Sequence, residues 1–520
     1  MPEPSAPLTP TDPLLARLAE LRAGDLPVHG GRTMAYVYDS GLDGLEELAN
    51  AAHAAFAGVN GLDMTAFPSV VALENDLVRR ATALLGGTAG TFTSGGTESC
   101  LLAVLTARQH ARRTRGVSEP ELILPETAHA AFHKAAELFG LRVVRVPVDP
   151  DTYKVGAADV AAAITEHTAL VVVSAPSYAH GVIDPVAEVA AEAHRRGVLC
   201  HVDACIGGWY LGHLRLAREA PTSEALVSGA LVSEAPMSDA PTSRALGAEA
   251  PVPEAPGPDV PAFDLRVPGV TSLSVDLHKY AYTAKGASLL LFRDAELRRH
   301  GWFAHAAWPG YPVVNATLQG TKAAGPLAAA WAVTERVGTE GYAALSARVR
   351  RATLALADGI GRIDGLRLLA RPEASLLAVA ADDPDIDVFV VADEIRGSGW
   401  YLQPQPAFGA SPANLHLTVT AAVADEETVR LLLDDLEKAV ARARATGPVR
   451  VAPALVEAAA SLDPDALTAQ EVELALTLAG VGAGGRLPER MAPVLAVLQA
   501  LPPRLSERLL PEVIGRLYEG

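Results

Sequence analysis

The feature that most constrains the fold is a regular alternation of apolar runs and amphipathic segments that begins near Glu121. The apolar runs are short and rich in Val, Leu and Ile, which is typical of buried strands; they cover residues 121–125, 141–147, 169–174 and 198–203. Segments with helical periodicity separate them, at residues 128–139, 157–166 and 186–196. Strands that alternate with helices at this spacing form a mostly parallel sheet. We therefore predict an α/β chain built on a doubly wound, mostly parallel sheet.

The remainder of the 520-residue chain predicts further parts around this sheet. Residues 1–70 are expected to form an N-terminal arm, and residues 71–325 the large domain that carries the sheet. A smaller C-terminal α+β domain is expected at residues 326–446, where two helical segments precede strand-like runs. Residues 447–520 are rich in Ala, Leu and Pro and predict a helical C-terminal extension, to which the sequence assigns no role.

Residues 217–262 interrupt the alternation. This stretch repeats Glu-Ala-Pro and Ala-Pro-Thr-Ser and contains no aromatic residue. A segment of Pro, Ser, Ala and Glu buries too little apolar surface to offset the entropy lost on ordering. We expect a disordered insertion in a surface loop, without a catalytic role.

Charge and cysteine content argue against several classes of protein. A net charge of -18 would repel the phosphate backbone of a nucleic acid. No apolar run reaches the ~18 residues that a membrane helix needs, and residues 1–13 lack the pattern of a signal peptide. Cys100, Cys200 and Cys205 form neither a disulfide framework nor a cluster with zinc spacing. We therefore expect a cytoplasmic protein with no metal, no nucleic-acid partner and no transmembrane segment.

Lys279 is the first candidate for chemistry. The strand-like residues 269–275 deliver it, beside His278, into a segment rich in small and hydroxyl side chains. An ordinary lysine has a pKa of about 10.4 and is a poor nucleophile at neutral pH. A lysine withdrawn from water at the end of a strand is a candidate to form a Schiff base with an aldehyde. Taken alone, such a pattern more often marks an ordinary lysine.

Residues 94–97, Ser-Gly-Gly-Thr, open a helical run and are called the glycine turn below. The free backbone N–H groups and the dipole at the start of a helix attract an anion, and glycines let it approach closely. The hydroxyls of Ser94 and Thr97 add donors. The sequence therefore favours a phosphate site here, although a plain helix cap at Thr97 is an alternative.

Two further residues suit a planar, charged ring. Asp203 ends a buried strand, where a carboxylate needs a cationic partner such as a protonated ring nitrogen; it could instead cap the next turn. His129 begins a helix among alanines and could stack on a flat ring or simply cap the helix. An anion site, a stacking imidazole, an acid for a ring nitrogen and a lysine for an aldehyde together fit pyridoxal 5'-phosphate.

In the order of its motifs, the chain resembles the group II pyridoxal-phosphate decarboxylases, and among them the sphingosine-1-phosphate lyases. The likeness covers roughly residues 30–445 outside the insertion. Each motif is modest alone, but their shared order is specific; they are residues 93–99, 128–132, 176–185, 201–208, 269–274, 278–280 and 285–286.

The resemblance implies a type I aminotransferase-like fold and a homodimer with the active site at the subunit interface. It implies three catalytic residues: Lys279 for the covalent bond to the cofactor, Asp203 for the pyridine nitrogen and His129 for the face of the ring. The further cofactor contacts that it implies are Ser94, Gly95, Gly96, Thr97 and His278, together with Gly320 and Thr321, which would reach the phosphate across the interface. The expected substrate contacts are Tyr36, Asp63, His180 and Lys285.

The chain departs from this family pattern at two places. Asp63 and Met64 stand where the lyase pattern has His-Pro, and Lys322 stands where the family loop has Arg. An Asp near a phosphorylated substrate would repel it, and a lysine cannot bind phosphate in the bidentate manner of arginine. Both changes weaken the case for a phospho-sphingoid substrate and leave the cofactor residues intact.

We predict a pyridoxal-phosphate-dependent lyase that breaks a carbon–carbon bond at the amine-bearing carbon of an amino acid or an amino-alcohol phosphate. Loss of carbon dioxide would make it a decarboxylase, and a retro-aldol break would make it an aldehyde-lyase. The side chains that orient the substrate decide which bond breaks. An aminotransferase and a non-catalytic scaffold of the same fold are the alternatives.

Overall fold

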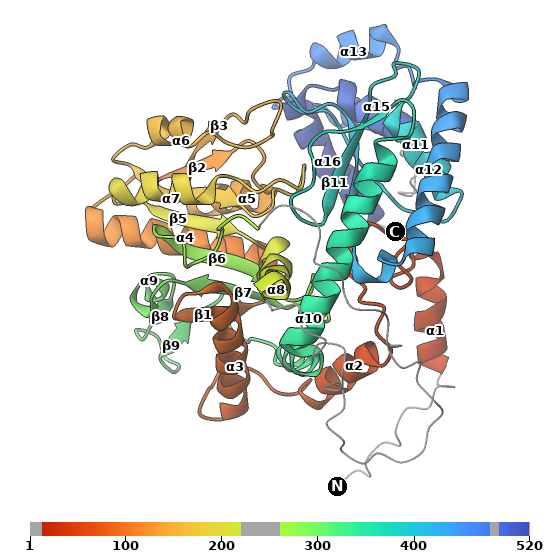
Figure 1. Cartoon of the computed structure of the whole chain (residues 1–520). Coiled ribbons are helices and arrows are strands. Elements are labelled where there is room, and N and C mark those ends of the chain that lie inside the picture. The colour runs from red at the N-terminus through yellow and green to blue at the C-terminus, as the bar shows by residue number, and fades with distance from the viewer. Residues whose placement is uncertain (1–12, 220–259, 479–487, 519–520) are drawn as a thin grey trace, which may run out of the picture.

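The computed structural model describes residues 13–219, 260–478 and 488–518 (Figure 1). Its largest sheet has seven strands in the order β1-β7-β6-β5-β4-β2-β3. Neighbouring strands from β3 to β6 run parallel, whereas β7 is antiparallel to both β6 and β1. The strands are β1 (Ala89–Thr93), β2 (Glu121–Pro125), β3 (Arg142–Val146), β4 (Thr168–Ser174), β5 (Leu199–Asp203), β6 (Val270–Asp276) and β7 (Ser288–Phe292). The prediction of a mostly parallel α/β sheet is confirmed.

Helices cover both faces of this sheet because side chains of each strand alternate between two apolar layers. On β2, Leu122 and Leu124 pack with α4 and α5, whereas Ile123 packs in the layer that holds α7 and α8. The helices around the sheet are α3 (Pro68–Leu85), α4 (Gly96–Arg115), α5 (Ala130–Phe139), α6 (Ala157–Ala163), α7 (Val186–Arg195), α8 (Gly207–Glu219) and α9 (Ala295–Arg299).

The carboxyl ends of the central parallel strands meet at one edge of the sheet. Ser174 on β4 is in register with Asp203 on β5, and Asp203 is in register with Ser274 on β6. Lys279 follows the last residue of β6 by three positions. Ligands of open α/β sheets bind at this edge. The pairing of the strands therefore brings together residues that the sequence keeps about 70 positions apart.

A second, antiparallel sheet has four strands in the order β10-β11-β13-β12. Three helices accompany it in the chain: α10 (Gly325–Ile360), α11 (Val388–Arg396) and α12 (Glu426–Thr446). Its strands are β10 (Leu366–Leu368), β11 (Leu376–Ala381), β12 (Gln403–Gln405) and β13 (Asn414–Thr418). The sequence predicts β11, β13 and α12 to within a few residues, but not the three-residue strands at the two edges.

Helix α10 joins the two sheets and differs from the sequence-based expectation of two helices at residues 326–337 and 341–362. It is continuous apart from a kink at Gly338, whose φ of 63° and ψ of 175° are not helical. Glycine adopts a positive φ without a steric penalty, so the chain bends there and the helix resumes.

The remaining elements belong to neither of the two larger sheets. They are α1 (Pro13–Leu21), the 3-10 turn η1 (Arg22–Gly24), α2 (Leu45–Ala55), the hairpin β8 (Phe303–His305) and β9 (Val313–Asn315), η3 (Ala421–Val423), α13 (Pro453–Ala460), α14 (Ala469–Leu478), α15 (Ala492–Ala500) and α16 (Pro503–Leu517). Helices α13, α14 and α16 share a small apolar core that includes Leu505 and Leu509. Helix α15 packs instead on α11, where the backbone N–H groups of Met491 and Ala492 donate to Asp393. The hairpin was not predicted.

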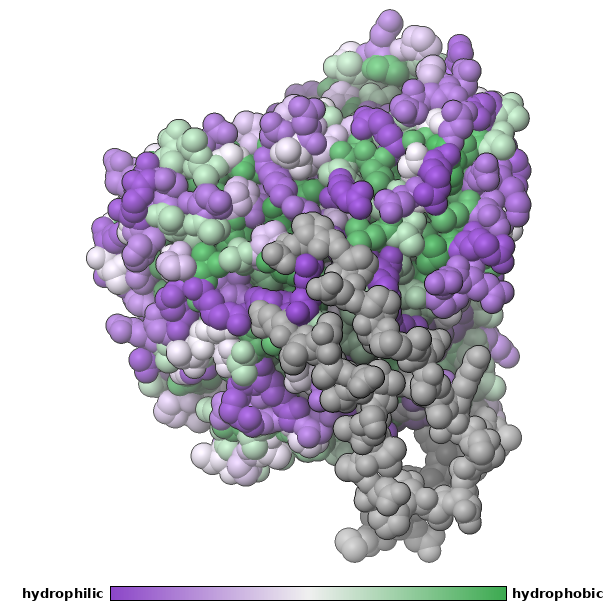
Figure 2. All heavy atoms as spheres, in the orientation of Figure 1, coloured by the Kyte–Doolittle hydropathy of each residue, from purple (hydrophilic) through white to green (hydrophobic). Residues whose placement is uncertain are grey.

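Most of the predicted insertion lies outside the described residues. Its first three residues, 217–219, continue α8, so the prediction placed its start too early. On the face shown in Figure 2, hydrophilic and apolar side chains are interspersed. Within the three described ranges, no helix combines the length and the apolar character needed to cross a membrane.

Candidate active site

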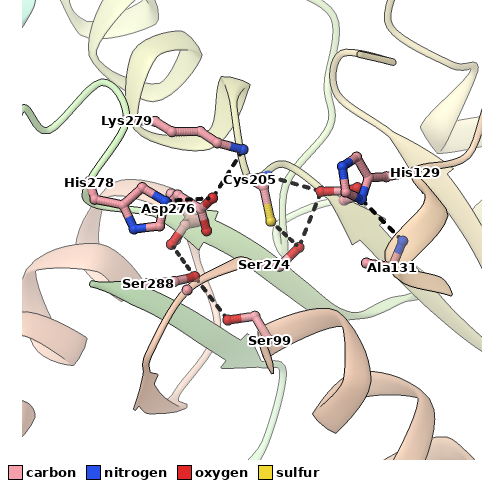
Figure 3. Close-up of polar contacts among 12 residues, drawn as sticks. Ser99, His129, Ala131, Cys205, Ser274, Asp276, His278, Lys279 and Ser288 are labelled. Carbon is pink, nitrogen blue, oxygen red and sulfur yellow. Dashed lines mark hydrogen bonds and ion pairs between the residues drawn. The ribbon is translucent and has the colours of Figure 1, made fainter. Parts of the chain in front are cut away.

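Lys279 lies just after β6, with its amine directed at the end of that strand (Figure 3). Its Nζ is 3.0 Å from Oδ2 of Asp276, and the side chains are only 21% and 2% exposed. Burial lowers the pKa of Lys279, but the carboxylate of Asp276 opposes burial and outweighs it, so the pKa lies well above the ordinary value. Burial also raises the pKa of Asp276, and the cationic neighbour Lys279 reverses this to a lowered pKa. The withdrawal from water expected for Lys279 is present, but the amine is held in a buried ion pair.

His278 lies beside the same carboxylate. Its Nε2 is 3.5 Å from Oδ2 of Asp276, and its Nδ1 accepts a hydrogen bond of 3.3 Å from the N–H of Ala287. Because Nδ1 is an acceptor, the ring proton of the neutral form is on Nε2, toward Asp276. Burial lowers the pKa of His278 to about 4. The imidazole also lies against the glycine turn, since a Cβ on Gly95 would stand 3.5 Å from its Cε1.

The glycine turn joins β1 to α4. Helix α4 begins at Gly96, and no side chain caps it. The alternative of a helix cap at Thr97 is therefore wrong, because Thr97 lies in the first turn of the helix. A Cβ on Gly96 would stand 2.7 Å from Oδ2 of Asp276 and 2.9 Å from Sγ of Cys205, so only glycine allows this approach.

Only one of the two carboxylate oxygens of Asp203 accepts hydrogen bonds from the described residues. Oδ1 accepts hydrogen bonds from the N–H of Cys205 at 3.1 Å and from the hydroxyl of Ser274 at 3.4 Å. Among the residues that the structure describes, none donates a hydrogen bond to Oδ2. The two sequence-based readings of Asp203 are therefore compatible: one oxygen caps the following turn, and the other is available to a cation.

His129 is the N-cap of α5, and its Nδ1 accepts a hydrogen bond of 3.2 Å from the N–H of Ala131 (Figure 3). This bond lies in the plane of the ring and fixes its orientation, while the faces of the ring stay available for stacking. The imidazole is nearly perpendicular to the ring of Tyr178, with the ring centroids 6.4 Å apart at 82°. Capping and stacking, which the sequence left as alternatives, can both hold.

Two of the predicted substrate residues meet at a group of tyrosines. The Nζ of Lys285 donates to the carbonyl oxygen of Tyr36 at 2.9 Å and lies 5.1 Å above the ring of Tyr38. Burial, and then the charge of Lys279, lower the pKa of Lys285 to about 8. Tyr36 has a φ of 67°, and its ring lies 5.9 Å from that of Tyr401. A cation is therefore held among aromatic side chains close to Lys279.

The other two predicted substrate residues have different surroundings. His180 is 4% exposed, stacks on Tyr153 with ring centroids 4.0 Å apart, and bonds through Nε2 to Ser411 at 3.0 Å. Its side chain is thus held in the protein interior. The exposed carboxylate of Asp63 accepts hydrogen bonds from Thr65 and Ala66, which builds a local turn. Neither residue is drawn toward Lys279 by these contacts.

Gly320 and Thr321 are exposed in the loop that precedes α10. This loop lies next to the glycine turn of the same subunit, because the N–H of Leu318 donates to Oε1 of Glu98 at 2.9 Å. Their predicted contact with a phosphate across the subunit interface involves a second chain and stays a prediction.

Sequence reasoning missed Asp276 and Tyr178. Asp276 ends a buried strand exactly as Asp203 does, so the argument applied to Asp203 could have found it. Tyr178 stacks on His416 of the second sheet with ring centroids 4.2 Å apart, and its hydroxyl donates to Gln403. No local signal in the sequence points to Tyr178, because its partners lie more than 200 residues further along the chain.

One group of possible metal ligands occurs in the described residues: Cys100, Asp203 and Cys205, whose ligand atoms lie within 4.8 Å of one another. A hydrogen bond with Cys100, together with burial, raises the pKa of Cys205 well above its ordinary value. The thiol of Cys205 is therefore protonated at neutral pH, and it donates to the hydroxyl of Ser274 at 3.2 Å. A metal would need the thiolate, so this group better serves to support Asp203.

The described residues fit pyridoxal phosphate. The uncapped start of α4 offers backbone donors to a phosphate, Lys279 supplies the amine, and Asp203 offers an unoccupied oxygen to a ring nitrogen. His129 has a ring fixed in orientation by its cap. All four derive from segments gathered at one edge of the sheet.

Two family models match the chain. One is described as "Aminotransferase class-V" and matches residues 87–207, which include the glycine turn and Asp203. The other is described as "Pyridoxal-dependent enzyme, C-terminal putative HTH domain" and matches residues 453–516, the segment of α13 to α16.

Related proteins cover most of the chain. The sphingosine-1-phosphate lyase of Arabidopsis thaliana is 33% identical over 453 residues, which cover 84% of this chain and 73% of the relative. The solved structure of Burkholderia pseudomallei sphingosine-1-phosphate lyase has a TM-score of 0.71 and 33% identity, and covers 85% of this chain and 93% of that one. Lactobacillus brevis glutamate decarboxylase has a TM-score of 0.67 at 17% identity, which indicates a shared fold alone.

Proposed function

The chain belongs to the sphingosine-1-phosphate lyase family, and on this premise we propose that it cleaves a carbon–carbon bond beside the amine of a small substrate that carries an anionic group. It is a pyridoxal-phosphate-dependent lyase. The observation that carries the proposed substrate class is Lys285, a cation among Tyr36 and Tyr38 and near Lys279. Its ammonium can pair with a phosphate or a carboxylate of the substrate.

Within this proposal, an amino-alcohol phosphate is the leading substrate class and retro-aldol cleavage the leading reaction. The similarity to sphingosine-1-phosphate lyases over most of the chain supports both. Loss of carbon dioxide from an amino acid is the second candidate, favoured by the replacement of the family's His-Pro by Asp63 and Met64. The exposed carboxylate of Asp63 makes this side of the site less favourable for a dianion.

When bound, pyridoxal phosphate supplies an aldehyde for the substrate's amine and a ring that withdraws electrons from the amine-bearing carbon. Lys279 would attach it and then move a proton to or from the reacting carbon through Nζ. Asp276 orients this Nζ by the ion pair of 3.0 Å. Asp203 would hold a proton on the ring nitrogen, because a carboxylate favours the charged form of a neighbouring base. The imidazole of His129 would cover one face of the ring.

The glycine turn would bind the cofactor's phosphate through the backbone N–H groups of α4 and the hydroxyls of Ser94 and Thr97. The neutral His278 would donate to the phosphate or to Asp276 through its Nε2. Gly320 and Thr321 would complete the phosphate site of a second subunit. These roles are supported by the geometry around Lys279 and by the resemblance of the motifs.

We propose a homodimer and a cytoplasmic location. Apolar side chains that remain exposed on the subunit support the dimer, among them Leu18 and Leu21 of α1, which are 56% and 64% exposed. Three free, buried cysteines suit a reducing compartment. Sedimentation at graded protein concentrations tests the dimer.

We also propose that residues 71–325 and 326–446 form separate domains, flanked by the arm 1–70 and the extension 447–520. Limited proteolysis tests these boundaries.

The decisive experiment incubates purified protein and pyridoxal phosphate with a panel of amino acids and phosphorylated long-chain bases. Mass spectrometry of the products separates the outcomes. An aldehyde with phosphoethanolamine supports the leading reaction, and an amine with carbon dioxide supports the second candidate. Formation of keto acids instead would contradict the proposal and indicate an aminotransferase. The Lys279→Ala variant is the control for uncatalysed breakdown.

A further inference from the structure

Two carboxylates outside the reacting centre, Glu74 of α3 and Glu98 of α4, each bridge the same two stretches of chain. One stretch is residues 92–97, the end of β1 with the glycine turn. The other is residues 318–322, called the partner loop below because it holds Gly320 and Thr321. We propose that Glu74 and Glu98 are positioning residues that clamp the glycine turn to the partner loop, so that the phosphate site of one subunit supports the phosphate site of the other. This rests on the proposed function, in which the partner loop reaches across the dimer.

Glu98 forms the first bridge. Its Oε2 accepts a hydrogen bond of 2.7 Å from the N–H of Ser94, and its Oε1 accepts one of 2.9 Å from the N–H of Leu318. The residue is 7% exposed, so water does not compete effectively for these bonds. Hydrogen bonds to an ionised carboxylate are stronger than neutral ones, and a buried N–H that loses its acceptor is destabilising. Glu98 therefore fixes the start of the glycine turn at a set distance from the partner loop.

Glu74 forms the second bridge, again with one carboxylate oxygen bound to each stretch of chain. Oε1 accepts a hydrogen bond of 2.9 Å from the N–H of Phe92, and Oε2 pairs with Nζ of Lys322 at 2.7 Å. The side chains of Lys322 and Glu74 are only 13% and 20% exposed. This contact gives a use to the departure from the family's arginine: Lys322 is engaged inside its own subunit.

The partner loop is held on its far side as well. The N–H of Gly61 donates to the carbonyl oxygen of Lys322 at 2.8 Å, and Asn60 forms an isolated β-bridge with Ala323. With both sides held, a shift of the glycine turn has to move the partner loop or break one of the four carboxylate contacts. Anion binding at the turn would thus restrict Gly320 and Thr321, which are otherwise exposed.

The first test compares two ligands that differ only in the phosphate. Glu98→Gln keeps the size of the side chain, but its NH2 group faces one N–H and breaks one of the two bonds. We expect pyridoxal phosphate to bind about 10-fold more weakly and pyridoxal to bind within about twofold of the wild type. Equilibrium titration, followed by the absorbance of the protein-bound ligand, gives both constants. Glu137→Gln, the same change at an exposed position on α5, is the matched control.

Equal weakening of both ligands, or of neither, would overturn the clamp. If the wild type binds neither ligand, the cofactor assignment itself fails, which is a separate result. Should Glu98→Gln not fold, Lys322→Met cuts only the Glu74 bridge at a partly exposed loop. There we expect about threefold weaker binding, again confined to the phosphorylated ligand.

The second test asks whether the effect crosses the interface. In heterodimers of differently tagged chains, one subunit is wild type and the other carries Lys279→Ala, so that only one subunit can attach the cofactor covalently. Adding Glu98→Gln to the Lys279→Ala chain should reduce retention of cofactor by the wild-type chain, measured by borohydride reduction and mass of the intact chain. Unchanged retention there, with loss in the Glu98→Gln homodimer, would show that the clamp serves its own subunit only and would overturn the proposed link.

Discussion

The cofactor side and the substrate side of the site are built in different ways. On the cofactor side, Asp203, Asp276 and Lys279 lie at or just after the ends of adjacent parallel strands, and hydrogen bonds or ion pairs hold each of them. On the proposed substrate side, Tyr36 comes from the N-terminal segment and Lys285 from the loop after β6, and both residues are partly open to solvent. A sheet edge fixes its residues by strand register, whereas the open side is free to vary. Asp63 and Met64, the departures from the family pattern, are exposed, and we propose that they border this open side.

The largest effect should come from the centre of the cofactor side. Lys279→Ala removes the amine that attaches the cofactor and moves the proton, so activity should fall by roughly 10³-fold or more. The measurement is product formation under saturating cofactor, together with the absorbance of the bound cofactor. An unchanged absorbance with retained activity would show that Lys279 is not the reacting amine and that the active site lies elsewhere.

Asp203→Asn should come next. The amide is isosteric but cannot stabilise a positive charge on a ring nitrogen, so kcat should fall by about 10²- to 10³-fold. Because Oδ1 is an acceptor for Cys205 and Ser274, the amide oxygen can keep these bonds and the fold should survive. Melting temperature serves as the control, and a loss of stability that matches the loss of rate would reduce Asp203 to a structural role.

Lys285→Met should change binding far more than the chemical step. Loss of the ammonium should raise KM for an anionic substrate by about 10-fold, with little change in kcat. The pKa of Lys285 is lowered to about 8, so the charged form, which binds the anion, is present below this pH and is lost above it. KM of the wild type should therefore rise as the pH increases through 8, and KM of Lys285→Met should not. A parallel rise in both proteins would remove Lys285 from substrate binding.

The smallest effect should come from Asp63→Asn. An asparagine oxygen can still accept the bonds from Thr65 and Ala66, so the turn should persist while the charge is removed. An exposed charge interacts weakly through water, so KM for a phosphorylated substrate should fall by about twofold. A fall of more than about 10-fold would mean that Asp63 faces the substrate directly and that the open side is more constrained than its exposure indicates.

The sequence predicted the large sheet, and the positions of Asp203 and Lys279 at its carboxyl edge, because both depend on local patterns. Buried parallel strands give continuous apolar runs, and residues such as Asp203 and Lys279 follow them at once in the chain. The three-residue strands β10 and β12 were not predicted, since so short a run carries no periodicity. The sequence predicts two helices, one on each side of Gly338. The structure has a single bent helix there, because the helix resumes directly after the kink.

Contacts between distant segments were beyond sequence reasoning. Tyr178 is positioned by His416, and His180 by Ser411, both of which belong to the segment of the second sheet. The resemblance places His180 near the substrate pocket; the structure holds its ring against Tyr153 and Ser411, and its contact with a substrate stays a prediction. The bridges made by Glu74 and Glu98 also join segments more than 200 residues apart, which no local motif announces.

Gly96 sets a limit on how this protein can change over evolutionary time. Even the single methyl group of alanine would come within 2.7 Å of one side chain and 2.9 Å of another. In a saturation library at this position, we therefore anticipate that selection for activity returns glycine alone. Neighbouring residues that are exposed to solvent should tolerate replacement. Adaptation toward new substrates would have to proceed by mutations elsewhere, leaving this one position unchanged through the lineage.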